Sequence, residues 1–210
     1  MTRNNNVIQI RGVESLGKGK YRIGFDTGVI CLVYGSEIRG MGIEAGACIS
    51  EEQYHTILYD IVGKRAKKRA LHLLEQMDRT EQQLREKLMA SEYPVRCIDD
   101  AIEYVKSFHY LDDERYAQTF TRYKKDKMSR QQIKQKLMMK GVSREIVSEA
   151  IEEEYDVDET VHIRSILEKK HFSNETADEG EFRRVYNYLL RRGFRSNDIL
   201  KEMKCIRADW

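Results

Sequence analysis

The stretch TEQQLREKL (residues 80–88) returns 49 residues later as SRQQIKQKL (residues 129–137), with hydroxyl, amide, basic and apolar residues at matching positions. The match continues at the same offset in three pairs of apolar residues: Ile98 with Val147, Ala101 with Ala150, and Ile102 with Ile151. A fainter third copy follows at a further offset of 52 residues, in Val185, Leu189, Gly193, Phe194, Ile199 and Met203. Self-similarity at this period predicts stacked helical repeats that share a continuous core.

Local signals mark where the helices of each repeat begin and end. Thr80-Glu-Gln-Gln83 and Ser129-Arg-Gln-Gln132 fit the capping box, in which hydroxyl and amide side chains bond to free backbone amides. Gly141 and Gly193 stand where a left-handed C-cap favours a residue without Cβ. The 3.6-residue period of the apolar residues then predicts three helices per repeat: 65–77, 80–90 and 95–107; 112–125, 129–140 and 143–154; 157–170, 178–192 and 196–206.

The N-terminal region has a different period. Residues 7–10, 20–25 and 28–33 are short β-rich runs, and Asp26-Thr27-Gly28 is a hairpin signal between the last two. Three strands make a small sheet that another element must cover. Helical spacing begins near Ile49 and predicts either one long helix or two that break near Gly63.

The predicted fold is therefore mainly α: a tandem array of three three-helix repeats, about nine helices in all, with a small N-terminal β element. We divide the chain into four segments: a β-rich element (1–50), a linker helix with the first repeat (51–108), the second repeat (109–156) and the third repeat (157–210).

Charge is segregated along the chain although the net charge is only +2. Residues 115–140 hold nine basic residues against one acidic residue, whereas residues 141–160 hold one Arg against eight acids. A basic block with so few acidic residues predicts an anionic partner, such as nucleic acid or an acidic protein surface. The alternative is a helical face that is only solvated. The acidic tract 152–159 either repels DNA or pairs with a basic patch of the partner.

We predict that the partner or DNA contacts basic residues of the second and third repeats: Arg115, Arg122, Lys124, Lys125, Lys127, Arg130, Lys134, Lys136, Lys140, Arg184, Arg191 and Arg192.

Two further features have competing interpretations. Tyr116, Phe120 and Tyr123 follow one stripe of a helix, which is typical of core packing, and stacking on nucleic-acid bases is the alternative. Asp112 and Asp113 could form a paired-carboxylate site, but acids ahead of a helix more often cap its amides and complement its dipole.

No pattern in the sequence indicates an enzyme. The five histidines are isolated, zinc-ligand spacing is absent and no glycine-rich phosphate loop occurs, so we expect no catalytic residues, no metal and no cofactor. The four cysteines form no CxxC pair, which is typical of reduced thiols in a cytoplasmic protein. No apolar run approaches the length that a membrane span requires.

The three-helix repeats, the stretch Leu111-Asp-Asp-Glu-Arg-Tyr-Ala-Gln118 and the positions of Gly141 and Gly193 resemble the RecX family, bacterial regulators of the RecA recombinase. The resemblance covers about residues 65–206. It implies a curved array that binds the groove of the RecA–single-stranded-DNA filament. It also implies inhibition of strand exchange, ATP hydrolysis and co-protease activity towards the LexA repressor, without catalysis by the regulator itself.

The partners that we expect are the RecA filament and single-stranded DNA, contacted directly or through the filament by a monomer of this chain. Such a protein would modulate DNA repair, homologous recombination and the SOS response. The alternative is a non-specific DNA-binding or architectural helical protein. The acidic residues of the third helices, such as Asp99 and Glu145, count against base readout by those helices.

Overall fold

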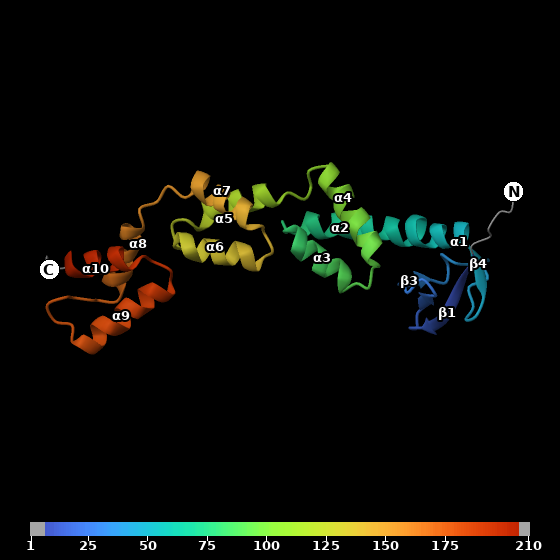
Figure 1. Ribbon diagram of the computed structural model, residues 1–210, viewed down its shortest axis with the longest axis horizontal. Helices are drawn as coiled ribbons and strands as arrows, with labels where there is room; N and C mark the ends of the chain where they lie inside the picture. Colours follow the sequence, from blue (N-terminus) through green and yellow to red (C-terminus); the bar gives the residue numbers. More distant parts are fainter. Residues whose placement is uncertain (1–6, 206–210) are drawn as a thin grey trace. The chain divides into compact units, whose positions relative to one another are not determined.

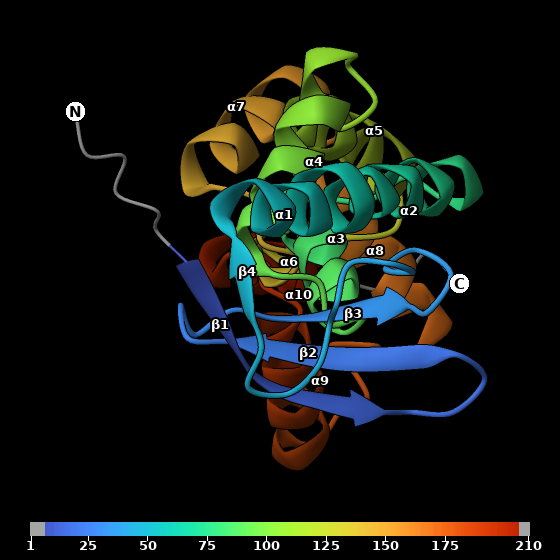
Figure 2. The ribbon, with the colours of Figure 1, turned by 90° about the vertical axis from the view of Figure 1, so that its right-hand side faces the viewer.

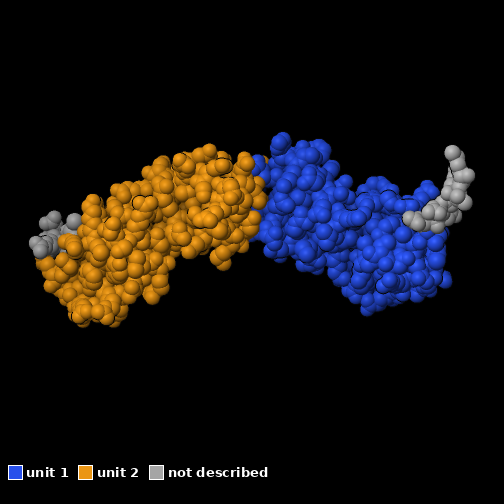
Figure 3. All heavy atoms as spheres, in the orientation of Figure 1, with its two compact units in different colours: residues 1–112 blue, residues 113–210 orange. Residues whose placement is uncertain are grey.

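The computed structural model describes residues 7–205, in two compact units: unit 1 (Met1–Asp112) and unit 2 (Asp113–Trp210) (Figure 3). Three sequence-based predictions extend beyond the described part of the chain. They concern residues 1–6 of the β element, the side chain of Cys205 and residue 206 of the last helix.

Unit 1 begins with a small antiparallel sheet of four strands in the order β3-β2-β1-β4. The strands are β1 (Val7–Ser15), β2 (Lys20–Phe25), β3 (Ile30–Tyr34) and β4 (Cys48–Ser50). The prediction of three strands was wrong by one, because β4 has only three residues and no local pattern. It forms by pairing with the start of β1, where Ile8 lies opposite Ile49.

One continuous helical segment follows the sheet and is made of α1 (Glu51–His55), the π-helix η1 (Thr56–Gly63) and α2 (Lys64–Gln76). Of the two alternatives, the single long helix is correct, since the junction residues all keep right-handed helical dihedral angles. Gly63 does not break the helix. A Cβ there would lie 3.1 Å from the carbonyl oxygen of Leu58, so glycine relieves crowding inside the wide π turn.

The sheet packs against this helix, as Figure 2 shows. Ile10, Ile23 and Val33 of the sheet and Ile57 and Val62 of the helix are fully buried in one cluster. That same cluster continues into α3 (Glu81–Met89) and α4 (Val95–Ser107). The β element and the first three-helix repeat therefore share a single core.

Arginine side chains also join the sheet to the helices. Arg22 donates from Nε and Nη2 to Glu92 at 3.0 and 2.8 Å. Arg65 donates to both carboxylate oxygens of Glu37, at 3.0 and 2.9 Å, and to the carbonyl of Leu32. These hydrogen bonds hold the helical segment against the small sheet, which needs another element to cover it.

Three cysteines in the described part of the chain are free thiols. Cys31 and Cys97 belong to the core of unit 1, where burial raises the pKa of the Cys31 thiol to about 12 and that of Cys97 to about 11. Both are therefore protonated and poorly reactive near neutral pH.

Nine helices within residues 64–205 form the three repeats (Figure 1). Repeat 1 is α2, α3 and α4. Repeat 2 is α5 (Asp113–Lys124), α6 (Arg130–Met139) and α7 (Arg144–Glu154). Repeat 3 is α8 (Glu159–Lys169), α9 (Glu179–Arg191) and α10 (Ser196–Cys205). The predicted fold class, mainly α with three three-helix repeats and a small N-terminal sheet, is confirmed.

The capping boxes begin α3 and α6 as predicted. Ser129 Oγ accepts from the backbone amide of Gln132 at 3.2 Å, and Gln132 Oε1 accepts in return from the amide of Ser129 at 3.3 Å. The corresponding threonine, Thr80, is fully buried like Ser129. The hydroxyl at the N-cap position therefore caps the helix and is buried in the protein interior at the same time.

Repeats 2 and 3 are joined at Ser129. Its hydroxyl donates to the carbonyl oxygen of Arg192 at 2.5 Å. Gly193, next in sequence, has φ +81°, and a Cβ there would lie 2.6 Å from Cβ of Gln131. The backbone amide of Arg130 donates to Glu159 at 2.7 Å. Repeats 2 and 3 therefore contact each other where the start of α6 meets the end of α9.

We expect Gly193→Ala to destabilise unit 2 by about 2–5 kcal/mol. The left-handed conformation costs an L-residue roughly 1–2 kcal/mol, and overpacking against Gln131 adds roughly 1–3 kcal/mol. Chemical denaturation of the full chain measures the loss. Gly46→Ala is the control, because Gly46 has φ +84° but nothing within 4 Å of the added Cβ. Equal losses in the two variants would show that the junction is not tightly packed.

Candidate interface on repeats 2 and 3

The predicted basic block lies on α5, α6 and the loop between them in repeat 2. Four lysines of the block make no ion pair with any carboxylate among the described residues: Lys124, Lys127, Lys134 and Lys136. Lys127 and Lys136 are exposed, and Lys124 and Lys134 are half-buried. These four, here called the unpaired lysines, are cations of the basic block that are available to an anionic partner.

Other cations of the block already have partners within repeat 2. Arg122 donates to both carboxylate oxygens of Glu154, from Nε at 2.9 Å and from Nη2 at 2.5 Å. Lys125 Nζ lies 2.7 Å from a carboxylate oxygen of Asp156. The acidic tract was expected to repel DNA or to pair with a partner, and for Glu154 and Asp156 this is corrected. Because α7 packs along α5, the end of α7 brings these acids to the basic helix.

Arg130 has a structural position as well. Its Nη2 donates to the carbonyl oxygen of Tyr155 at 2.9 Å, and its guanidinium lies 4.8 Å from the centre of the Tyr155 ring. Tyr155 is buried, and its hydroxyl donates to the carbonyl of Met128 at 3.0 Å. Arg130 therefore helps to close repeat 2 near the junction with repeat 3.

The core packing predicted for the aromatic stripe of α5 holds in part: Tyr116 and Phe120 pack against the core cluster of repeat 2, and Tyr123 does not. Tyr116 and Phe120 are half-buried, and Tyr123 is 75% exposed. The buried face of α5 instead carries the smaller residues Ala117 and Thr121, which lets α7 approach closely. Lys140 covers the outer side of the stripe, with Nζ 5.8 Å from the Tyr116 ring centre and 5.9 Å from that of Phe120.

The paired aspartates lie where α5 begins. Asp113 begins α5 and lies in its acidic first turn, as the dipole interpretation predicted. Among residues 7–205, no group of three or more His, Cys, Asp or Glu side chains is arranged to hold a metal ion.

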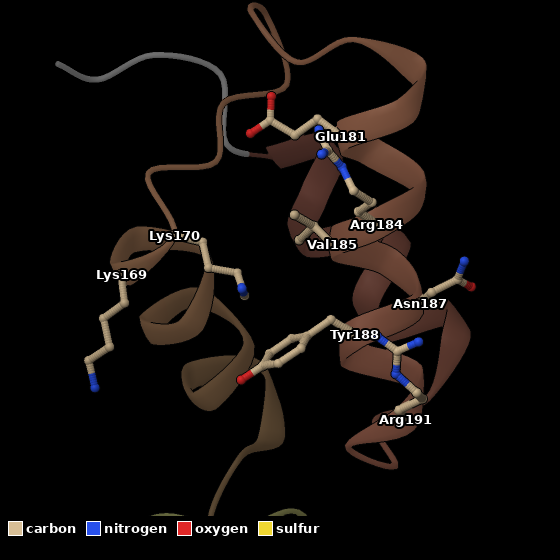
Figure 4. A pocket seen from close by; sticks show the side chains of 8 residues that line it. All are labelled: Lys169, Lys170, Glu181, Arg184, Val185, Asn187, Tyr188 and Arg191. Carbon is tan, nitrogen blue, oxygen red and sulfur yellow. The ribbon is translucent and has the colours of Figure 1, made fainter.

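A second cationic surface lies in repeat 3, in a hollow of about 700 Å³ between α8 and α9 (Figure 4). Arg184 and Arg191, both predicted from the sequence, line it together with Lys169, Lys170 and Tyr188, which sequence reasoning missed. The signal was the Lys169-Lys170 pair at the end of α8, whose position beside α9 only the fold reveals.

The remaining predicted residues divide between the two surfaces. Arg192 lies beside the hollow, with its guanidinium 5.1 Å from the Tyr188 ring centre. Arg115 is exposed on the first half of α5. The structure thus separates the twelve predicted cations into a set on repeat 2 and a set on repeat 3, and Glu154 and Asp156 oppose part of the first set.

Three-helix repeats that follow one another along the chain and carry cationic surfaces are typical of a repeat-type binding protein. Family models identify the kind: the model of the first three-helix domain of RecX matches residues 66–104, and that of the second three-helix domain matches residues 112–151. These matches fall on repeats 1 and 2.

Relatives that match over most of the chain agree. The regulatory protein RecX of Caldanaerobacter subterraneus subsp. tengcongensis is 34% identical over 165 residues, which are 78% of this chain and 81% of the relative. The regulatory protein RecX of Clostridioides difficile is 30% identical over 165 residues, which are 77% of this chain and 76% of the relative. The chain belongs to the RecX family, and the resemblance seen in the sequence is confirmed.

Solved structures show the same fold. A crystal structure of a regulatory protein RecX matches with a TM-score of 0.61 and 21% identity, over 94% of this chain and 98% of the other. The crystal structure of RecX from Lactobacillus salivarius matches with a TM-score of 0.57 and 20% identity, over 69% of this chain and 98% of the other. In the part of the chain that the structure describes, no helix is long and apolar enough to cross a membrane.

The ion pairs of repeat 2 should make its stability depend on pH. Arg122 lowers the pKa of Glu154 and Lys125 lowers that of Asp156, so these acids bind protons less readily in the folded chain than in the unfolded chain. Their stabilising effect is present at neutral pH and is lost as the pH falls through about 4 and below. We expect Glu154→Gln to lower the melting temperature at pH 7 and to reduce the further loss on acidification.

Glu149→Gln is the matched control, because Glu149 lies exposed on the same helix and forms no ion pair with any residue of the described range 7–205. It should change neither the melting temperature at pH 7 nor its acid dependence. The same acid dependence in Glu154→Gln as in the unmodified chain would contradict a role for the Arg122–Glu154 pair.

Proposed function

We propose that this chain is a non-enzymatic regulator that binds the RecA–single-stranded-DNA filament and inhibits its recombinase, ATPase and co-protease activities. The observation that carries the proposal is membership of the RecX family, with matched three-helix domains over residues 66–104 and 112–151. Relatives that cover most of the chain are named regulatory protein RecX. The protein would act in the cytoplasm, as a monomer, to modulate DNA repair, homologous recombination and the SOS response.

The charge distribution supports this function physically. A tandem array presents successive surfaces to a long periodic partner. The unpaired lysines of repeat 2 and the cations of repeat 3 favour a partner with regularly spaced negative charge, as a nucleoprotein filament has. Glu154 and Asp156 confine that attraction to part of repeat 2, because they neutralise Arg122 and Lys125.

A second candidate is non-specific DNA binding without RecA. The exposed ring of Tyr123 favours it, because aromatic rings beside cations can stack on the bases of a single strand. Filter binding with and without RecA separates the two functions. Tight binding to DNA combined with no effect on RecA would favour the second candidate.

The direct test of the proposed function is the DNA-dependent ATPase activity of RecA. We expect this chain to suppress it when added in smaller molar amounts than RecA, because one regulator on a filament affects many protomers. The inhibition should weaken with increasing salt, since the attraction is between exposed charges. Unchanged ATPase activity at saturating amounts of the chain would refute the proposal.

Charge reversal tests whether the unpaired lysines take part. Changing Lys124, Lys127 and Lys136 to Glu should weaken inhibition about tenfold at roughly 0.1 M salt and flatten its salt dependence. Helicity should remain unchanged, because none of the three is buried. The concentration for half-maximal inhibition at several salt concentrations is the measurement.

The control carries the same change in charge on unit 1, where Lys18, Lys68 and Lys87 are exposed and become Glu. This control should inhibit nearly as well as the unmodified chain. Equal weakening in both triple variants would indicate that net charge alone, and not the face of repeat 2, determines binding.

A further inference from the structure

Each three-helix repeat exposes one large apolar side chain near the end of its middle helix. The three residues occupy one position, at the offsets of 49 and 52 residues that relate the repeats: Met89, Met138 and Leu190. They are 54%, 45% and 38% exposed. In each repeat the residue just before is a fully buried leucine. These three, here called the apolar end residues, therefore lie next to the core with their own side chains exposed.

The same backbone hydrogen bonds hold all three apolar end residues. Their carbonyl oxygens accept from the amide three residues later at 2.9, 3.0 and 2.8 Å, and the carbonyl of the preceding leucine accepts from the next amide at 3.4, 3.2 and 3.3 Å. This pair of bonds is the Schellman motif, which ends a helix in a defined geometry. It is kept in repeat 1, where Glu92 takes the left-handed conformation that Gly141 and Gly193 take in the other repeats. Each apolar end residue thus has the same local backbone.

A hydrogen-bond acceptor lies beside each apolar end residue. One helical turn earlier, three exposed residues carry a side-chain carbonyl or carboxylate oxygen: Glu86, Gln135 and Asn187. Residues three apart are neighbours on a helix surface, so the acceptor and the apolar side chain form one paired feature. Glu86 accepts from Gln82 at 2.9 Å through Oε1, and its carboxylate has a second oxygen for a further donor.

The neighbouring surface position differs from repeat to repeat. The residue after the apolar end residue is Ala90, Met139 or Arg191. A single exposed methionine such as Met139 needs no explanation, because folded proteins expose many apolar atoms. An apolar side chain beside an acceptor at one position in three repeats indicates instead a contact that recurs.

This pair of groups favours a protein partner over nucleic acid. A phosphate backbone offers hydrogen-bond acceptors and negative charge, so it gives an acceptor no donor and an apolar side chain no pocket. An apolar pocket on a protein, with N–H groups at its polar rim, matches both groups. Because the pair recurs, the partner that fits best presents the same pocket several times, as an array of identical subunits does.

We infer that the apolar end residues dock in equivalent apolar pockets on successive identical subunits of a protein array. Each pocket has an N–H donor at its rim for Glu86, Gln135 or Asn187. The inference rests on the proposed function, whose filament is such an array, and adds a contact between proteins that is separate from the cationic surfaces. None of the apolar end residues lines the hollow between α8 and α9.

The test measures cosedimentation of the full chain with RecA filaments formed on oligo(dT), and RecA ATPase inhibition in parallel. Glutamine replaces Met89, Met138 and Leu190 singly and together, since its helix propensity is close to theirs. We expect each single change to raise the concentration for half-maximal binding about tenfold, because burial of one Met or Leu side chain contributes about that factor in affinity. The triple variant should raise it about a hundredfold or more, because the three contacts lie in separate repeats.

Met139→Gln is the matched control. Met139 is next to Met138 and more exposed, at 87%, but its counterparts are Ala90 and Arg191. This variant should bind the filament as the unmodified chain does. All variants should keep their melting temperatures and their affinity for a single-stranded oligonucleotide without RecA, because the changed side chains are exposed and uncharged.

A triple variant that binds the filament as well as the unmodified chain would overturn the inference and leave the proposed function standing. Equal weakening by Met139→Gln would overturn it too, since apolar surface in general would then be responsible. Loss of oligonucleotide binding in the triple variant would assign these residues to nucleic acid and not to a protein pocket. Binding through the apolar end residues without inhibition of the RecA ATPase refutes only the proposed function.

Discussion

One buried hydroxyl, that of Ser129, connects the features on which unit 2 depends. It caps the start of α6 and donates to the carbonyl of Arg192 at the end of α9. Because both roles use the same oxygen, helix initiation in repeat 2 and its attachment to repeat 3 cannot be changed separately. At the same junction, a Cβ on Gly193 would lie 2.6 Å from Cβ of Gln131, so this contact also requires a residue without Cβ. The attachment of repeat 3 to repeat 2 therefore depends on the Ser129 hydroxyl and on Gly193 together.

The helical architecture could be read from the sequence because its signals are local. Capping boxes at Thr80 and Ser129, a C-cap glycine at Gly141 and the 3.6-residue period all lie within a few residues of the feature they determine. The fourth strand could not be found in this way, because Ile49 pairs with Ile8, and strands β2 and β3 lie between them in the sequence. The π-helix η1 was not predicted either, since its residues have an ordinary helical pattern in the sequence.

The candidate interface was predicted in composition but not in arrangement. Counting charges locates the cations in the sequence, yet whether a given cation is available to a partner depends on contacts between distant residues. Arg122 is paired because Glu154 lies 32 residues further on but next to it in space. Lys170 was not predicted because its position is set by a contact with Tyr188 in the next helix, which the local sequence does not show. The aromatic stripe of α5 was predicted only in part for a related reason: Tyr116 and Phe120 pack at the edge of the core, whereas Ala117 and Thr121 are the residues that α5 buries fully.

The core shared by the sheet and repeat 1 has a consequence for how the chain loses structure. Repeats 2 and 3 each bury a separate apolar cluster, whereas the strands, α1, η1 and repeat 1 bury one in common. Elements that share a core unfold together. The slowly exchanging backbone amides of unit 1 should therefore exchange with one common free energy of opening. A protease that cuts between the sheet and α2 would expose Ile57 and Val62 and disrupt that shared core. The site where the chain can be cut or divided without breaking a shared core is therefore the end of unit 1, at Asp112, and not the end of the strands.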